Sequence, residues 1–187
     1  MRSRSTLARL LGAALVLTSL TLVGPAPVTA VASPAVAPVA APISGPASGW
    51  TARGEDYPGS KVQTDVKIPM SDGVVLRADV ERPVDADGNV VETPLPVLVT
   101  ITAYNKTVLS TGGAGLAGAD PSYLVKRGYV QVTVDARGTG SSRGRWAAFS
   151  ARENKDAGEV MNWAAEQPWS DGTTGMTGAS YMGISQL

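Results

Sequence analysis

Two strand-like runs constrain the fold of this chain more than any other feature. The first, PVLVTIT (96–102), is an almost unbroken series of β-branched and apolar residues. Such a run is typical of a strand buried on both faces of a parallel sheet. The second, YVQVTVD (129–135), alternates valines at 130, 132 and 134. Because parallel strands need long crossover connections, we expect helices between the strands of this region.

Helical signatures occupy the segments between these strands, as the crossovers require. DPSYLVKRG predicts a short helix with Asp120 as its N-cap and Pro121 as its first residue. SARENKDAGEVMNWAAEQP predicts a longer helix, in which Ser150 and Glu153 have the spacing of a capping box. Pro168 ends that helix.

The remaining segments complete an α/β arrangement. Two strand-like runs, KVQTDVKIPM and VVLRADVERP, are joined by the turn residues 71–73 and predict an antiparallel hairpin. A further strand is expected at Gly172–Gly178, and YMGISQL begins another helix. The predicted fold is therefore a hairpin followed by a β-α-β-α-β parallel sheet. Functional loops of such sheets follow the carboxyl ends of the strands, here after Thr102, Val134 and Gly178.

Ser180 lies in the last of these loops and is the candidate nucleophile. A nucleophile elbow is a strained strand-to-helix turn that needs small residues around the serine. Gly178 meets this need two residues before the serine, but the generic motif places its second glycine where this chain has Met182, and Gly183 follows one residue later. From the motif alone, a serine that merely caps a helix remains an alternative.

An elbow of this kind needs donors for the oxyanion of the reaction. One donor is the backbone N–H of the residue after the nucleophile, here Tyr181, and the other comes from the loop after the third strand. In that loop, AYNK places Tyr104 where its hydroxyl could donate. An aromatic residue that only packs the loop is the alternative interpretation of Tyr104.

Glycine-rich stretches raise a second hypothesis, nucleotide binding. The loop DARGTGSSRGRW follows a strand and could cradle phosphate, although we interpret Asp135 and Arg137 as a structural ion pair. Gly113, Gly115 and Gly118 satisfy G-x-G-x-x-G, but they lie too far beyond the preceding strand for a dinucleotide site.

The composition narrows the functional classes further. Sixteen basic and sixteen acidic residues give zero net charge, which offers no electrostatic footprint for nucleic acid or an anionic membrane. Cysteine and histidine are both absent, so disulfides are excluded and a metal would have only oxygen ligands. The composition therefore gives no indication of a nucleic-acid or membrane partner.

The N-terminal residues predict export rather than fold. Residues 1–30 combine a basic segment, an apolar run too short for a membrane span, and small residues before an A-x-A-like cleavage site. We expect cleavage of this signal peptide to leave no stable membrane insertion, and the protein to be secreted. An uncleaved anchor is the less favoured alternative, because Pro25 and Pro27 break the segment. Residues 31–49, rich in alanine and proline, predict a flexible linker.

From about Val62 to Leu187 the chain resembles the cocaine-esterase and X-Pro dipeptidyl-peptidase (CocE/NonD) family of α/β-hydrolases. The matching pieces are MSDGVVLRADVERP, PVLVTITAYNK, DARGTGSSRG and NWAAEQPWSDGTTGMTGASYMG. The family's elbow is G-x-S-Y-x-G, so Gly183 lies where the family has it. The resemblance implies Ser180 as nucleophile and the Tyr104 hydroxyl and Tyr181 N–H as oxyanion donors. It implies no metal or cofactor, and a substrate that is an ester, an X-Pro peptide or a β-lactam acyl group.

The chain departs from the family in one respect, because the triad acid and histidine of α/β-hydrolases follow the serine. Only seven residues follow Ser180, and no histidine is present. We therefore expect residues 50–187 to be the N-terminal half of an α/β-hydrolase domain, truncated just after the nucleophile elbow, and to be nearly inactive alone. The alternatives are a non-catalytic truncated module with this fold or, least favoured, a nucleotide-binding domain.

Overall fold

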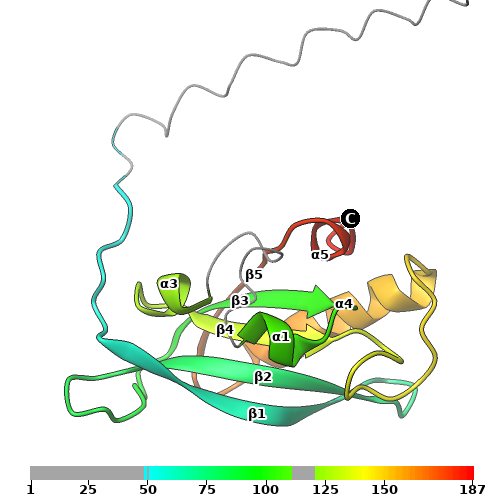
Figure 1. Cartoon of the computed structure of the whole chain (residues 1–187), viewed down its shortest axis with the longest axis horizontal. Helices are drawn as coiled ribbons and strands as arrows, with labels where there is room; N and C mark the ends of the chain where they lie inside the picture. The colour runs from blue at the N-terminus through cyan, green and yellow to red at the C-terminus, as the bar shows by residue number, and fades with distance from the viewer. Residues whose placement is uncertain (1–48, 50, 111–120) are drawn as a thin grey trace, which may run out of the picture. The chain divides into compact units, whose positions relative to one another are not determined.

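A mixed β-sheet organises the part of the chain that the computed structural model describes, which is Gly49, residues 51–110 and residues 121–187 (Figure 1). The predicted signal peptide, the linker up to residue 48, and the G-x-G-x-x-G glycines lie outside the described residues. Within those residues the sheet has five strands, β1 (Gly59–Pro69), β2 (Val75–Val84), β3 (Leu95–Thr102), β4 (Val130–Asp135) and β5 (Ser170–Met176).

The strand order in space differs from the order in sequence. It is β1-β2-β4-β3-β5, so β4 inserts between the hairpin and β3. β1 and β2 pair antiparallel, with Gly73 in the left-handed region (φ 82°) at the turn. β4 pairs antiparallel with β2 and parallel with β3, and β5 is parallel to β3 on its other side. The carboxyl ends of β3, β4 and β5 therefore share one edge of the sheet.

Short helices and one long helix connect and follow the strands. They are α1 (Lys106–Ser110), α3 (Pro121–Val125), α4 (Ala151–Ala165) and α5 (Tyr181–Ile184). The β3-α3-β4 and β4-α4-β5 crossovers run in opposite directions across the sheet, so right-handed connections place α3 and α4 on opposite faces. Figure 1 shows this arrangement, with α4 behind the strands and α1 and α3 in front.

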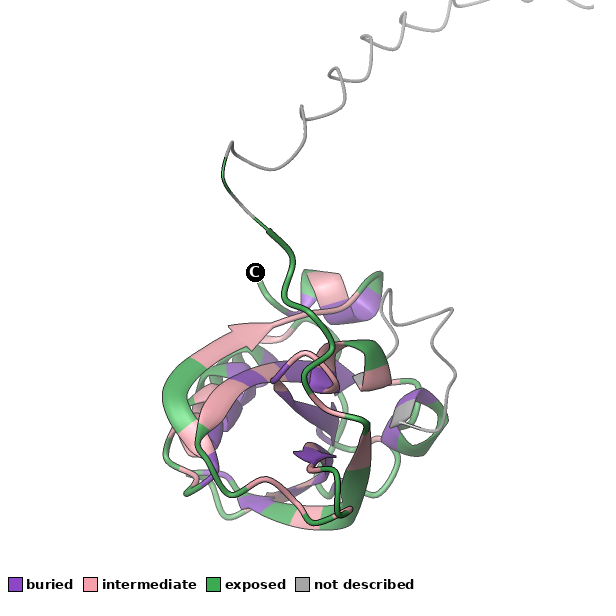
Figure 2. Cartoon of the chain, turned by 90° about the vertical axis from the view of Figure 1, so that its left-hand side faces the viewer, coloured by how far each residue is buried: buried purple, intermediate pink, exposed green. Residues whose placement is uncertain are grey.

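The hydrophobic core follows the central strands (Figure 2). All six residues of β4 are buried, as expected for a strand covered on both faces. On α4, Val160 and Ala164 are fully buried and belong to the same core as Val99 and Val132. Burial of an aliphatic side chain of this kind contributes about 1.5–3 kcal/mol, which makes α4 and the central strands one packed unit.

Several predicted boundaries are confirmed and a few are wrong. The hairpin, the first two parallel strands and the Ser150 cap of α4 are present, and the Ser150 hydroxyl accepts the N–H of Glu153. The last strand ends at Met176 rather than Gly178, and α1 was not expected. β2 continues through Pro83, which lies beyond the segment Arg77–Glu81 that pairs with β4.

In the described part of the chain, no helix has both the length and the apolar character that a bilayer crossing requires.

Candidate active site

Ser180 occupies a strained turn between β5 and α5. Its backbone angles are φ 55° and ψ −129°, a conformation that a residue with a side chain rarely adopts. The surrounding glycines make the turn sterically feasible. A Cβ on Gly178 would lie 2.4 Å from the Cβ of Met182, and a Cβ on Gly183 would lie 3.1 Å from the Gly178 carbonyl oxygen. Both glycines therefore serve close packing around the serine, including the one that the generic motif places elsewhere.

The Ser180 hydroxyl does not cap the helix that follows. Although Ser180 is the N-cap residue of α5, its side chain makes no capping hydrogen bond. The helix-cap interpretation of Ser180 is therefore wrong, because the hydroxyl that would satisfy the helix points elsewhere. Its Oγ lies 3.5 Å from the hydroxyl oxygen of Tyr104, and either oxygen can donate in that contact.

Tyr104 and Tyr181, the two predicted oxyanion donors, both lie beside the serine. Tyr104 follows β3 in a tight turn, in which its N–H donates to the Thr102 hydroxyl at 2.9 Å. The rings of the two tyrosines meet edge to face with centroids 6.0 Å apart. Tyr181 is the first residue of α5, and N–H groups in a first turn have no carbonyl partner within their own helix. The structure thus brings together Ser180, Tyr104 and Tyr181.

A buried lysine anchors the turn that carries Tyr104. The side chain of Lys106 is only 3% exposed, and its Nζ pairs with Asp65 on β1 at 2.9 Å and Asp79 on β2 at 3.0 Å. Burial alone would lower the pKa of Lys106, but the hydrogen bonds and charges of these carboxylates outweigh it and raise that pKa. Lys106, the last residue of AYNK, therefore ties this turn to the hairpin, a role that no sequence signal indicated.

The glycine-rich loop after β4 is folded around a carboxylate of its own chain. Asp135 accepts the backbone N–H of Lys106 and the backbone N–H of Ser141, each at 2.7 Å. Gly140 is required because a Cβ there would lie 2.1 Å from Asp135 Oδ2. A phosphate bound in this loop would face the Asp135 charge, so the geometry argues against the nucleotide-binding hypothesis.

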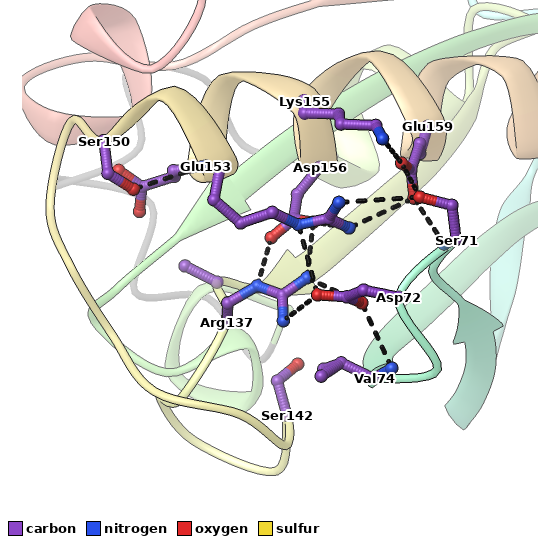
Figure 3. A network of polar contacts seen from close by, with 12 residues as sticks. Ser71, Asp72, Val74, Arg137, Ser142, Ser150, Glu153, Lys155, Asp156 and Glu159 are labelled. Atoms are coloured by element: carbon purple, nitrogen blue, oxygen red, sulfur yellow. Dashed lines mark hydrogen bonds and ion pairs between the residues drawn. The ribbon is translucent and has the colours of Figure 1, made fainter.

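Arg137 pairs with acidic residues other than the predicted one. Its guanidinium forms two hydrogen bonds of 2.7 Å with Asp156 on α4, and an ion pair of 2.9 Å with Asp72 in the hairpin turn (Figure 3). These bonds raise the pKa of Arg137, with those to Asp156 contributing most. The predicted Asp135–Arg137 pair is wrong because the Asp135 carboxylate already binds backbone N–H groups. The true pairs join α4, the hairpin and the loop after β4.

A pocket of about 270 Å³ opens beside the Ser180 hydroxyl. Its lining includes two aromatic residues that sequence reasoning missed, Trp146 and Phe149, from the segment before α4. Both rings pack on Tyr181, with centroids 6.5 Å and 5.4 Å from it. None of the described residues that line the pocket is charged, so the pocket wall is apolar apart from the hydroxyls of Ser180 and the tyrosines.

Glu153 makes different contacts from those of a standard capping box. Its carboxylate accepts the backbone N–H of Phe149 and the phenol hydroxyl of Tyr181, rather than the N–H of the Ser150 cap. The carboxylate thus lies directly behind the elbow. Among the described residues, no group of three or more acidic side chains is arranged to hold a metal ion.

This strand order, with a strained serine turn after β5 and a tyrosine after β3, defines an α/β-hydrolase. Residues 72–187, more than half of the chain, match the X-Pro dipeptidyl-peptidase (S15) family. The chain therefore belongs to this family of serine hydrolases, and its relatives are of the CocE/NonD type.

Individual relatives agree with this assignment. Cocaine esterase from Rhodococcus sp. (strain MB1 Bresler) is 36% identical over 125 residues, which are 67% of this chain and 20% of the esterase. A CocE/NonD family hydrolase from Staphylococcus aureus is 31% identical with a TM-score of 0.58, covering 67% of this chain and 24% of that one. An α-amino acid ester hydrolase is 25% identical with a TM-score of 0.56, covering 80% and 25%. The chain thus spans about a fifth of the curated relative's length.

Proposed function

We propose that this chain supplies the nucleophile and the oxyanion donors of a secreted serine hydrolase that cleaves carboxylic esters. The observation that carries the proposal is the Ser180 turn. Its strained backbone places the serine hydroxyl, which makes no helix-capping hydrogen bond, 3.5 Å from the hydroxyl of Tyr104. Strain of this kind persists only when the surrounding structure holds it, and it concentrates at catalytic turns.

The proposed reaction is acyl transfer through a covalent intermediate. Ser180 Oγ attacks the ester carbonyl carbon while a histidine takes its proton. The Tyr104 hydroxyl and the Tyr181 N–H stabilise the tetrahedral oxyanion, and the alcohol leaves with the proton from the histidine. Water then attacks the acyl-enzyme, which releases the acid and restores the Ser180 hydroxyl. These 187 residues contain no histidine, so the proposed reaction needs a base that they do not supply. In α/β-hydrolases the acid and the histidine of the triad follow the serine along the chain.

The pocket favours an ester over an X-Pro peptide. An N-terminal dipeptide carries an ammonium group that needs an acidic partner, whereas the described lining of the 270 Å³ pocket is uncharged and largely aromatic. The 36% identity to cocaine esterase supports the same choice. The family description, X-Pro dipeptidyl-peptidase, makes peptide cleavage the second candidate.

The proposal is tested on the protein expressed from its complete gene. We expect turnover of p-nitrophenyl esters with a kcat/KM at least about a hundredfold above that for X-Pro p-nitroanilides. Ser180→Ala should lower kcat by roughly 10⁴-fold or more. Ser170→Ala, at the opposite end of β5, is the matched control and should retain wild-type activity. Equal turnover by the wild type and Ser180→Ala would refute the nucleophile assignment, and preferred anilide cleavage would favour the peptidase.

Secretion is the localisation that we propose. Its support is the sequence of residues 1–30, with a basic start, an apolar run and small residues before the cleavage site. N-terminal sequencing of protein recovered from the culture medium should begin shortly after Ala30. Intact protein that starts at Met1 and stays with the cells would contradict the proposal.

A further inference from the structure

Glu153 is a buried acidic residue that the proposed reaction does not use. It is the third residue of α4 and is only 7% exposed. Its carboxylate accepts two hydrogen bonds, from the Phe149 N–H and from the Tyr181 hydroxyl. Its own N–H donates to the Ser150 hydroxyl at 3.3 Å, as the N-cap bond of α4. A buried carboxylate in the first turn of a helix is further stabilised by the helix dipole.

The two donors to this carboxylate belong to different parts of the site. Tyr181 directly follows Ser180 and offers the N–H that the proposed oxyanion needs. Phe149 forms part of the pocket wall and has a backbone φ of 57°, a conformation that is unfavourable for a residue with a side chain. One carboxylate therefore holds both the elbow and the wall of the pocket, across 28 and 4 residues of sequence.

The phenol of Tyr181 is suited to this contact over a wide pH range. Burial raises its pKa, and the hydrogen bond with Glu153 raises it further, so the hydroxyl keeps the proton that it donates. The Tyr181 ring in turn contacts the rings of Tyr104, Trp146 and Phe149. Displacement of the Tyr181 side chain would therefore change its contacts with all three of these aromatic rings.

We propose that Glu153 is a positioning residue, which fixes Tyr181 relative to Ser180 and fixes Phe149 in the pocket wall. This inference rests on the proposed esterase function. Glu153 acts through its two partners and does not touch the substrate. Since a group that only stabilises the fold would leave kcat and KM of the folded enzyme unchanged, the two roles differ in a measurable way.

The experiment compares three variants of the full protein with two esters. Tyr181→Phe removes only the phenol oxygen and should lower kcat about tenfold for p-nitrophenyl acetate, with KM within about twofold. Glu153→Gln keeps one acceptor but faces two donors, so it should lower kcat similarly. It should also raise KM about fivefold for p-nitrophenyl benzoate, which is large enough to contact Phe149. The double variant should have a kcat no lower than that of Glu153→Gln, because both changes affect the same hydrogen bond between Tyr181 and Glu153.

Ser150→Ala is the matched control, because it weakens the same helix end without removing either hydrogen bond to the Glu153 carboxylate. It should lower the melting temperature and leave kcat unchanged. The inference is overturned if both Tyr181→Phe and Glu153→Gln keep kcat within about twofold of wild type, or if Ser150→Ala lowers kcat as much as they do. Should Glu153→Gln fail to fold, Tyr181→Phe decides alone. Loss of activity in Ser180→Ala with silent Glu153 and Tyr181 variants would sink this inference only, whereas an active Ser180→Ala would sink the esterase function as well.

Discussion

Asp156 provides the sharpest test of what holds the site's supporting elements together. Its side chain is 3% exposed, accepts two hydrogen bonds of 2.7 Å from Arg137 and forms an ion pair of 2.8 Å with Arg152. Asp156→Asn keeps the shape but removes the charge and turns one acceptor into a donor that faces a guanidinium. Breaking a buried pair destabilises by about 3–5 kcal/mol. Arg137 keeps Asp72 at 2.9 Å, so we expect the lower end, about 3 kcal/mol.

Hydrogen exchange of the peptide that covers α4 (Ala151–Ala165) is the appropriate assay, because it reports local opening in a protein of any size. A loss of about 3 kcal/mol should accelerate exchange roughly a hundredfold or more. Lys155→Gln is the control on the same helix, since its ion pair with Glu159 is 3.8 Å long and its side chain is 61% exposed. That change should shift exchange less than about threefold. An Asp156→Asn effect as small as the control's would refute the reasoning.

Three further predictions concern the site and its pH response. Tyr104→Phe should lower kcat for esters by roughly 10²–10³-fold with little change in KM, because it removes one oxyanion donor. Steady-state kinetics measure both constants. Gly178→Ala should abolish labelling of Ser180 by a fluorophosphonate, because its Cβ would lie 2.4 Å from that of Met182; full labelling would contradict the packing argument. The hydrogen bond with Arg137 lowers the pKa of Asp72. The stabilisation of the fold by this pair is therefore present above the unfolded pKa of about 4 and is lost as pH falls through the lower folded pKa. Asp72→Asn should therefore flatten the acid decline of the urea midpoint as pH falls below about 4, and an unchanged slope there would count against this pairing.

The sequence was sufficient to predict most elements of this fold but not their order in space. Period-two alternation and caps mark β4 and α4 locally, because side-chain burial and terminal N–H groups leave signals within a few residues. The insertion of β4 between β2 and β3 leaves no such local signal. The short helix α1 was also missed, since five residues that are held by a buried lysine show no helical periodicity.

The candidate site likewise contains residues that local sequence could predict and residues that it could not. Ser180, Tyr104 and Tyr181 could be proposed because each directly follows a predicted strand or the nucleophile itself. The ion-pair partners of the charged residues could not be predicted, because which charges pair depends on their distances in the folded structure. Arg137 bonds to Asp156 on α4, 19 positions away, and not to its near neighbour Asp135. Family resemblance added the roles, and the geometry added the carboxylate behind the elbow.

The insertion of β4 beside β2 has a consequence for the protein during translation. β2 ends at Val84, whereas β4 begins at Val130, so the hairpin leaves the ribosome well before its inner edge can be paired. At roughly 5–20 residues per second, this interval lasts a few seconds. During this interval other nascent chains can contact Leu76 and Ala78, which are fully buried in the finished sheet. Chaperone binding to the nascent hairpin during that interval would protect the fold from aggregation.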